Sequence, residues 1–60
     1  MAQRENQYYY FAPDIAEILS VSVPTAYRII ARLNKELEDK GYLTVRGRIS
    51  KKYFTERMYA

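Results

Sequence analysis

The stretch that decides the fold is residues 22–41, SVPTAYRIIARLNKELEDKG, which carries the clearest helix signal in the chain. Ser22 is a good N-cap, and Pro24 falls in the first turn, where a missing N–H costs nothing. Gly41 follows the last periodic residue, as a C′ glycine does. Between these ends, apolar residues recur at spacings of three and four, which places them on one face of a helix. They are Ala26, Ile29, Ile30, Leu33 and Leu37.

The opposite face of this helix is basic in its first half and acidic only near its end. Cations near a helix N-terminus oppose the helix dipole, which prefers anions there. This placement favours a role in binding, and the alternative is a solvated amphipathic helix. The residues of this polar face are Thr25, Tyr27, Arg28, Arg32 and Lys35, followed by Glu36, Glu38 and Asp39.

Length and composition exclude several classes of function. The 60 residues make one domain, with a core near the lower limit for independent folding. The chain has no cysteine and no histidine, so it lacks thiolate ligands, the commonest metal ligand and the usual general base. We therefore expect neither an enzyme nor a cofactor. No apolar run approaches the roughly 20 residues that span a bilayer, and no signal peptide is evident, so a cytoplasmic protein is expected.

The net charge of +3 is unevenly distributed along the chain. Residues 46–60 carry five cations against the single carboxylate of Glu56, whereas residues 1–22 are acidic on balance. Cations gathered towards one end of a small chain indicate a polyanionic partner.

The segments before the long helix complete a helix-turn-helix. Residues 1–7 are polar and aperiodic, and we expect a mobile arm before a single domain over residues 8–60. The aromatic run YYYF, residues 8–11, is expected mainly to cover the core, with at least one ring exposed; stacking on bases is the alternative. Residues 12–19, APDIAEIL, predict a short helix, which a tight connection joins to the long one, as in a helix-turn-helix.

Residues 42–49, YLTVRGRI, predict a β-hairpin, and we define the wing as residues 42–50. A three-residue loop at 46–48 would place Leu43, Val45 and Ile49 on one buried face, whereas a two-residue loop would not. Its basic tip would meet a phosphate backbone or enter a minor groove. An edge hairpin kept soluble by charge is the alternative. The tip consists of Arg46, Gly47 and Arg48.

Residues 50–60 predict a short C-terminal helix capped by Ser50. It is too short to be stable alone and is expected to pack on the core through Tyr53, Phe54 and Met58. The expected fold is therefore α+β and mostly helical: a winged helix-turn-helix with a short helix, a long recognition helix, a β-hairpin wing and a short C-terminal helix. Lys51 and Lys52 would extend the basic surface of the wing.

The segment FAPDIAEILSVSVPTAYRIIARLN, residues 11–34, resembles small winged helix-turn-helix proteins related to MerR DNA-binding domains and phage excisionases. In those proteins a short apolar helix leads to a serine and then to Thr-x-Tyr-Arg, and a hairpin with a basic, glycine-containing tip follows. The second helix is longer here than is usual, and no dimerisation coiled coil or effector domain follows. The matching residues are Ile15, Ala16, Leu19, Ser22, Thr25, Tyr27, Arg28, Arg46, Gly47, Arg48 and Ile49.

The resemblance implies a sequence-specific double-stranded DNA-binding protein of a mobile element or phage, most simply an excisionase-type architectural factor. Thr25, Tyr27 and Arg28 would contact base edges in the major groove. The protein would be a monomer in solution and cooperative on DNA, with an integrase or recombinase as a further partner. Contacts to the DNA backbone would come from Arg32, Lys35, Arg46, Gly47, Arg48, Lys51 and Lys52.

Three other functions stay open from the sequence. A small transcriptional repressor would use the same DNA-binding mode. A protein-interaction module would bind an acidic partner through exposed tyrosines and the basic wing. An RNA or single-strand binder would rest on the YYYF run alone.

Overall fold

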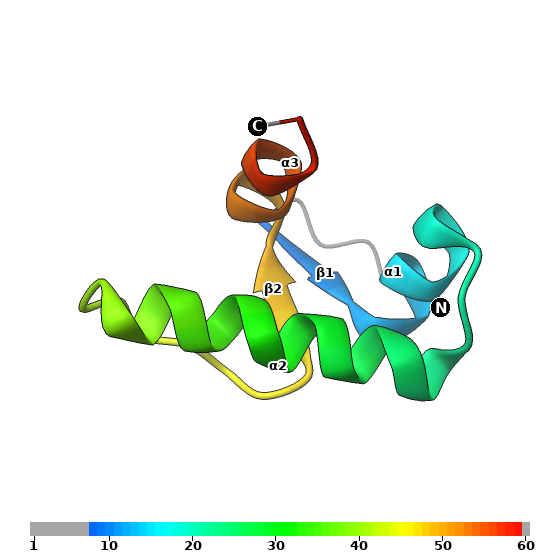
Figure 1. Ribbon diagram of the computed structural model, residues 1–60, viewed down its shortest axis with the longest axis horizontal. Coiled ribbons are helices and arrows are strands. Elements are labelled where there is room, and N and C mark those ends of the chain that lie inside the picture. Colours follow the sequence, from blue (N-terminus) through cyan, green and yellow to red (C-terminus); the bar gives the residue numbers. More distant parts are fainter. Residues whose placement is uncertain (1–7, 60) are drawn as a thin grey trace.

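The computed structural model describes residues 8–59, and their side chains as far as Met58; the predicted arm, residues 1–7, lies outside them. Figure 1 shows α2 along one side of the molecule, with α1, the two strands and α3 on the other. The predicted class, α+β, mainly helical and winged-helix-like in layout, is confirmed. In chain order the elements are β1 (Tyr9–Phe11), α1 (Ala12–Leu19), α2 (Val23–Asp39), β2 (Arg48–Ser50) and α3 (Lys51–Tyr59).

The first helix, α1, covers the residues predicted for it. The carboxylate of Asp14 accepts a hydrogen bond of 2.9 Å from the backbone N–H of Phe11, which satisfies one of the donors left over at a helix N-terminus. The helix ends at Ser20, whose φ of 57° is left-handed. The N–H of Val21 then donates to the carbonyl of Ala16 at 2.9 Å, and the chain turns into α2.

The second helix, α2, lies within the predicted range of 22–41. The hydroxyl oxygen of Ser22 accepts a hydrogen bond from the N–H of Thr25 at 3.3 Å, as an N-cap does. Gly41 has a φ of 92°, a conformation that L side chains rarely adopt, and the N–H of Tyr42 donates to the carbonyl of Leu37 at 3.0 Å. The predicted apolar stripe faces the core: Ala26, Ile30 and Leu33 are buried, and Ile29 and Leu37 are partly buried.

The predicted β-hairpin over residues 42–49 is wrong. Within residues 8–59 the sheet has two strands, and they are β1 and β2, antiparallel, with Tyr10 opposite Ile49. Residues 42–45 form no strand, and the side chain of Leu43 is 100% exposed where burial was expected. Ile49 is buried as predicted, but its neighbour in the sheet comes from the start of the described chain.

Two contacts explain why β2 pairs with β1. The ring of Tyr10 is half-buried and meets the buried ring of Phe54 edge-on, with centroids 5.6 Å apart, so β1 brings apolar area to the core. The segment 42–45 is held by α2 instead, since the hydroxyl of Thr44 donates to the carboxylate of Glu38. Of the aromatic run, Tyr10 therefore covers the core as predicted, and it does so from a strand, whereas Tyr8, Tyr9 and Phe11 are exposed.

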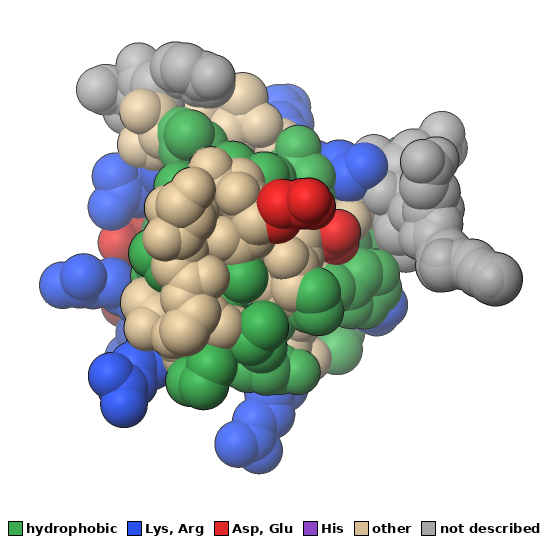
Figure 2. All heavy atoms as spheres, turned by 90° about the vertical axis from the view of Figure 1, so that its right-hand side faces the viewer, with side chains coloured by type: hydrophobic (Ala, Val, Ile, Leu, Met, Phe, Trp, Pro, Cys, Tyr) green, Lys and Arg blue, Asp and Glu red, His purple; other side chains and the backbone are tan. Residues whose placement is uncertain are grey.

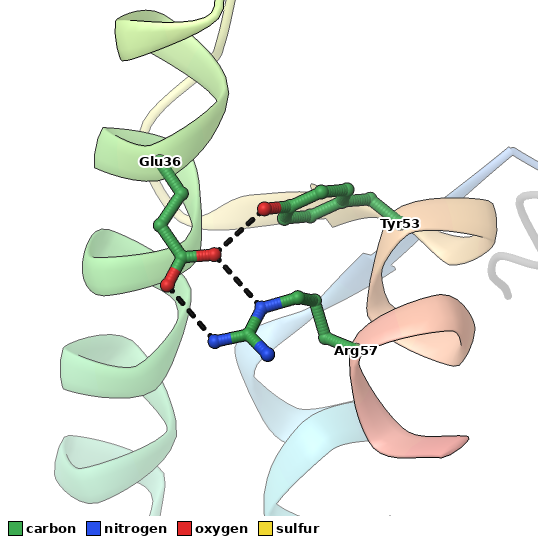
Figure 3. A network of polar contacts seen from close by, with 3 residues as sticks. All are labelled: Glu36, Tyr53 and Arg57. Atoms are coloured by element: carbon green, nitrogen blue, oxygen red, sulfur yellow. Dashed lines mark hydrogen bonds and ion pairs between the residues drawn. The ribbon is translucent and has the colours of Figure 1, made fainter. Parts of the chain in front are cut away.

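The third helix, α3, packs onto the core through part of the predicted face. The hydroxyl of Ser50 accepts a hydrogen bond from the N–H of Tyr53, and Phe54 is buried. Met58 is 45% exposed, so its predicted burial is wrong. Tyr53 and Arg57, one turn apart, face α2 and meet Glu36 there, so the helix is turned with a polar edge against α2 (Figure 3).

Candidate nucleic-acid interface

The first half of α2 presents an exposed face to solvent. Arg28 and Arg32 are exposed, and the ring of Tyr27 is 51% exposed. The hydroxyl oxygen of Thr25 accepts a hydrogen bond of 2.9 Å from the hydroxyl of Ser22, so this side chain supports the helix start and keeps its own proton for a further acceptor. In Figure 2, which views the end of the molecule where α1 meets α2, Lys and Arg side chains project from the lower and left-hand edges.

The turn at residues 46–47 lies against this face. It has two central residues, because the N–H of Arg48 donates to the carbonyl of Val45 at 3.4 Å, and the predicted three-residue loop is therefore wrong. Gly47 has a φ of 85°, which a turn of this kind requires at its third position and which favours glycine. A Cβ placed on Gly47 would lie 3.5 Å from the ring of Tyr27, an ordinary van der Waals distance, so the ring lies beside the turn.

The helix α2 and the turn at residues 46–47 line a hollow of about 450 Å³ that is open to solvent. Arg28 reaches it from α2 and Arg46 from the turn, and Arg46 is exposed. Two arginines that lie far apart in the sequence thus line one hollow, together with Tyr27. The hollow is lined by Tyr27, Arg28, Ala31, Asn34, Arg46 and Gly47.

Asn34 belongs to this site, and the sequence reasoning missed it. Its side chain is only 7% exposed, and its amide donates to the carbonyls of Val45 at 3.2 Å and Arg48 at 3.1 Å. A signal was present: Asn34 follows Ile30 by four positions and therefore lies on the apolar stripe. A polar side chain at a buried position needs hydrogen-bond partners, and here they are the two carbonyls on either side of the turn.

Arg48 is not at the tip of the turn, where the sequence placed it. It is the first residue of β2 and is half-buried, with its guanidinium carbon 4.6 Å from the centre of the Tyr9 ring. Its Nε is buried and finds no hydrogen-bond acceptor among the described residues. Arg48 is therefore held by the sheet, whereas Arg46 is exposed to solvent.

The remaining predicted cations lie outside the hollow. Lys35 forms an exposed ion pair with Asp39, 3.6 Å between the Nζ and carboxylate oxygen, and such a pair contributes little to stability. Lys51 and Lys52 begin α3, at the end of β2 away from the turn, and the ammonium of Lys51 lies 5.1 Å from the centre of the Tyr10 ring. The structure therefore does not bring these three lysines together with Arg28 and Arg46.

A polar network joins α2 to α3 behind this surface (Figure 3). One carboxylate oxygen of Glu36 accepts hydrogen bonds from the hydroxyl of Tyr53 at 2.6 Å and from Nε of Arg57 at 2.9 Å; the other accepts from a terminal nitrogen of Arg57 at 3.0 Å. The hydrogen bonds from Arg57, and next the one from the hydroxyl of Tyr53, lower the pKa of Glu36 from 4.5 to about 2. The guanidinium of Arg57 is therefore engaged in the contact between α3 and α2. Glu36 in turn raises the pKa of Arg57.

Other kinds of site find no support in the part of the chain that the structure describes. Among residues 8–58 no three His, Cys, Asp or Glu side chains gather where they could hold a metal ion. No described helix is both long and apolar enough to cross a membrane.

The short helix α1 is joined by a tight turn to the long helix α2, and the basic first half of α2 lies beside the turn at residues 46–47. These features define a small helix-turn-helix protein of winged-helix-like layout. The chain is 38% identical over 45 residues to the ICEBs1 excisionase of Bacillus subtilis (strain 168), across 75% of this chain and 70% of that protein. It therefore belongs to the family of that excisionase. No family model matches the chain, and no solved structure matches it.

Proposed function

We propose that this protein is an excisionase-type factor that binds double-stranded DNA and sets the direction of recombination for a mobile element. The observation that carries the proposal is the meeting of Arg28 and Arg46, from a helix and a turn, on one exposed surface. A helix and an adjoining turn suit the major groove and the neighbouring backbone of one duplex. Membership of the excisionase family supports the same conclusion, with an integrase-type recombinase as the further partner.

In this mechanism the first turns of α2 enter the major groove. The guanidinium of Arg28 donates two hydrogen bonds to a guanine, a contact worth about 1–3 kcal/mol of discrimination against other bases. The ring of Tyr27 and the hydroxyl of Thr25 lie on the same part of the helix and meet neighbouring base edges. Arg32 and Lys35, further along α2, meet phosphates, which position the helix without reading sequence.

The turn supplies the second contact. Arg46 meets the sugar–phosphate backbone or a narrow minor groove, where arginine is attracted by the strong negative potential. Gly47 carries no side chain, so the backbone of the turn can approach the duplex closely. Arg48, Lys51 and Lys52 do not line the hollow, and in this mechanism they add positive charge that attracts the duplex over a longer range.

Two other candidates remain, with different tests. A small transcriptional repressor would use the same surface on DNA. A protein-interaction module is favoured by a separate observation: Leu43 and Tyr42 are 100% and 63% exposed, although both are apolar and large.

Binding of fluorescent duplexes over a range of salt concentrations tests the proposal. In a plot of the logarithm of the association constant against the logarithm of salt concentration, each phosphate contact should make the slope more negative by about 0.9. The affinity should therefore fall steeply as the salt concentration rises. A protein contact anchored by apolar side chains would be nearly insensitive to salt. Failure to bind any duplex at low salt would leave the interaction module as the better account.

Single substitutions test the two halves of the surface. Arg28→Ala should reduce the preference for a cognate duplex over a scrambled one, because a base contact is lost. Arg46→Ala should weaken binding to both duplexes by a similar factor, because a backbone contact carries no sequence information. The matched control is Arg57→Ala, which removes the same charge from an arginine committed to Glu36. Equal loss of specificity from Arg28→Ala and Arg46→Ala would contradict the assignment.

A further inference from the structure

We propose that Asn34 is a positioning residue for DNA recognition, which fixes Arg46 relative to Arg28 so that helix and turn meet the duplex as one rigid unit. This inference rests on the proposed function and assigns a role to a residue that contacts no DNA itself. It begins from the two hydrogen bonds of the Asn34 amide, to the carbonyls of Val45 and Arg48.

These carbonyls stand immediately before and after the turn at residues 46–47. One NH₂ group therefore spans the turn and holds both of its ends to α2. The chemistry is specific, since an amide has two N–H donors on one nitrogen, a hydroxyl has one donor and a carboxylate has none. The side chain is also short, so the turn is held close to the helix axis.

The position of Asn34 shows that this arrangement has a cost. Asn34 lies in the apolar stripe of α2 and is 7% exposed, where a leucine would bury more apolar surface. Burying an amide is favourable only when its hydrogen bonds are made, and a leucine there would leave two carbonyls without this donor. The fold thus keeps a polar group in its core at the point where the turn must be held.

Strand pairing cannot hold this turn. In a β-hairpin, hydrogen bonds between the strands would fix both ends of the turn, but here residues 42–45 form no strand. The turn at residues 46–47 is held by α2 instead, through two of its residues. The ring of Tyr27 lies beside Gly47, and Asn34, seven positions later on the same face, donates to the flanking carbonyls.

A double-mutant cycle on DNA binding tests the role of Asn34. Asn34→Ala should raise Kd by about the same factor as Arg46→Ala and should lower the salt slope by about 0.9, the share of one phosphate. In the Arg46→Ala background, Asn34→Ala should then have almost no further effect. The matched control is Tyr53→Phe, which also removes a hydrogen bond to α2 without changing charge, and it should combine multiplicatively with Arg46→Ala.

A second variant covers the case in which Asn34→Ala does not fold at the temperature of the assay, as judged by circular dichroism. Asn34→Leu fills the buried position with an apolar side chain and removes both N–H donors, so it should reproduce the same loss and the same lack of additivity with Arg46→Ala. In the folded variants, amide chemical shifts of Arg46 and Gly47 should move while those of α1 do not.

The outcomes separate this inference from the proposed function. If Arg28→Ala and Arg46→Ala weaken binding but the effects of Asn34→Ala and Arg46→Ala multiply, Asn34 has only a structural role and the inference is wrong. If Arg46→Ala leaves binding unchanged while Arg28→Ala weakens it, the turn is outside the interface and the inference is again wrong. If neither arginine matters, the proposed function itself fails.

Discussion

Arg46 and Arg48 stand two positions apart and carry the same side chain, yet their surroundings give them different tasks. Arg46 is exposed in the turn beside Arg28. Arg48 is half-buried in β2 with its guanidinium over the ring of Tyr9. The sequence predicted both as exposed tip residues, because the spacing of charges cannot show that the tip has two central residues instead of three. Asn34 could be recognised in the sequence as a polar residue on the apolar stripe, but its role could not, because its hydrogen-bond partners lie 11 and 14 positions away.

The different surroundings of Arg46 and Arg48 predict different effects on stability. Arg48→Ala should lower the free energy of unfolding by about 0.5–2 kcal/mol, the range for a cation–π contact that is partly shielded from water. Arg46→Ala should leave it almost unchanged. Thermal unfolding of both variants at equal ionic strength measures the difference, and equal melting temperatures would show that Arg48 is not held by the sheet.

Leu33 offers a test of the core at the same scale. It was predicted near the middle of the apolar stripe and is 7% exposed in the structure. Leu33→Ala should cost about 2–5 kcal/mol of unfolding free energy, as truncation of a buried leucine generally does. A domain of this size has little stability to spare, so the variant should be partly unfolded at room temperature. Ile18→Ala, at a side chain that is 44% exposed, is the control and should cost much less.

At the scale of elements, local signals predicted the helices, and long-range partners decided the sheet. Caps and periodicity gave α1 and α2 nearly their observed ends, because both signals lie within the segments themselves. The strand at residues 42–45 was wrong because β2 found a better partner in β1, far away along the chain. The β-propensity of an aromatic run could have suggested a strand at residues 8–11, but no local pattern could have chosen its partner.

The contact between α2 and α3 predicts a dependence of stability on pH. Folding lowers the pKa of Glu36 from 4.5 to about 2, chiefly through the hydrogen bonds from Arg57. A group whose pKa is lowered by folding stabilises the fold above its unfolded pKa, so this contribution is present at neutral pH. It should be lost as pH falls from about 4.5 towards 2. Because Glu36 is near the surface, added salt should reduce the effect.

Denaturant unfolding of the parent and of Glu36→Gln at several pH values measures this contribution. The glutamine variant should be less stable than the parent at pH 7, and the difference should shrink as pH falls through the range from 4.5 to 2. Tyr53→Phe, which keeps the pair of Glu36 with Arg57, should retain most of the pH dependence. A constant difference between parent and Glu36→Gln at all pH values would show that the ion pair does not form.

At the scale of the whole molecule, size limits what one copy can do on DNA. The backbone of the described residues extends over 33 × 21 × 21 Å. Its longest dimension is therefore about one turn of B-DNA, or roughly 10 base pairs. Bending a site of about 20–30 base pairs by tens of degrees costs on the order of 1–6 kcal/mol, so an architectural role needs contacts from several copies.

This size predicts stepwise assembly. The protein should be a monomer in free solution and should give successive, cooperative mobility shifts on a long fragment that carries several sites about 10 base pairs apart. If the complex bends DNA, its mobility should depend on where the sites lie in the fragment. A stable dimer without DNA, with one unbent complex on an inverted repeat, would favour the transcriptional repressor instead.

The pairing of Tyr10 with Ile49 has a consequence for how the molecule is made. The two helices that precede β2 rest on local contacts, but the sheet closes a loop that contains most of the chain, and such long-range closure carries an entropic cost before it brings any gain. A nascent chain that has not yet reached residue 48 contains the whole of α2 and still lacks both the sheet and the settled turn. The surface proposed to bind DNA should therefore form only when β2 has been synthesised and has paired with β1. A new copy of the protein should be unable to bind DNA before that point.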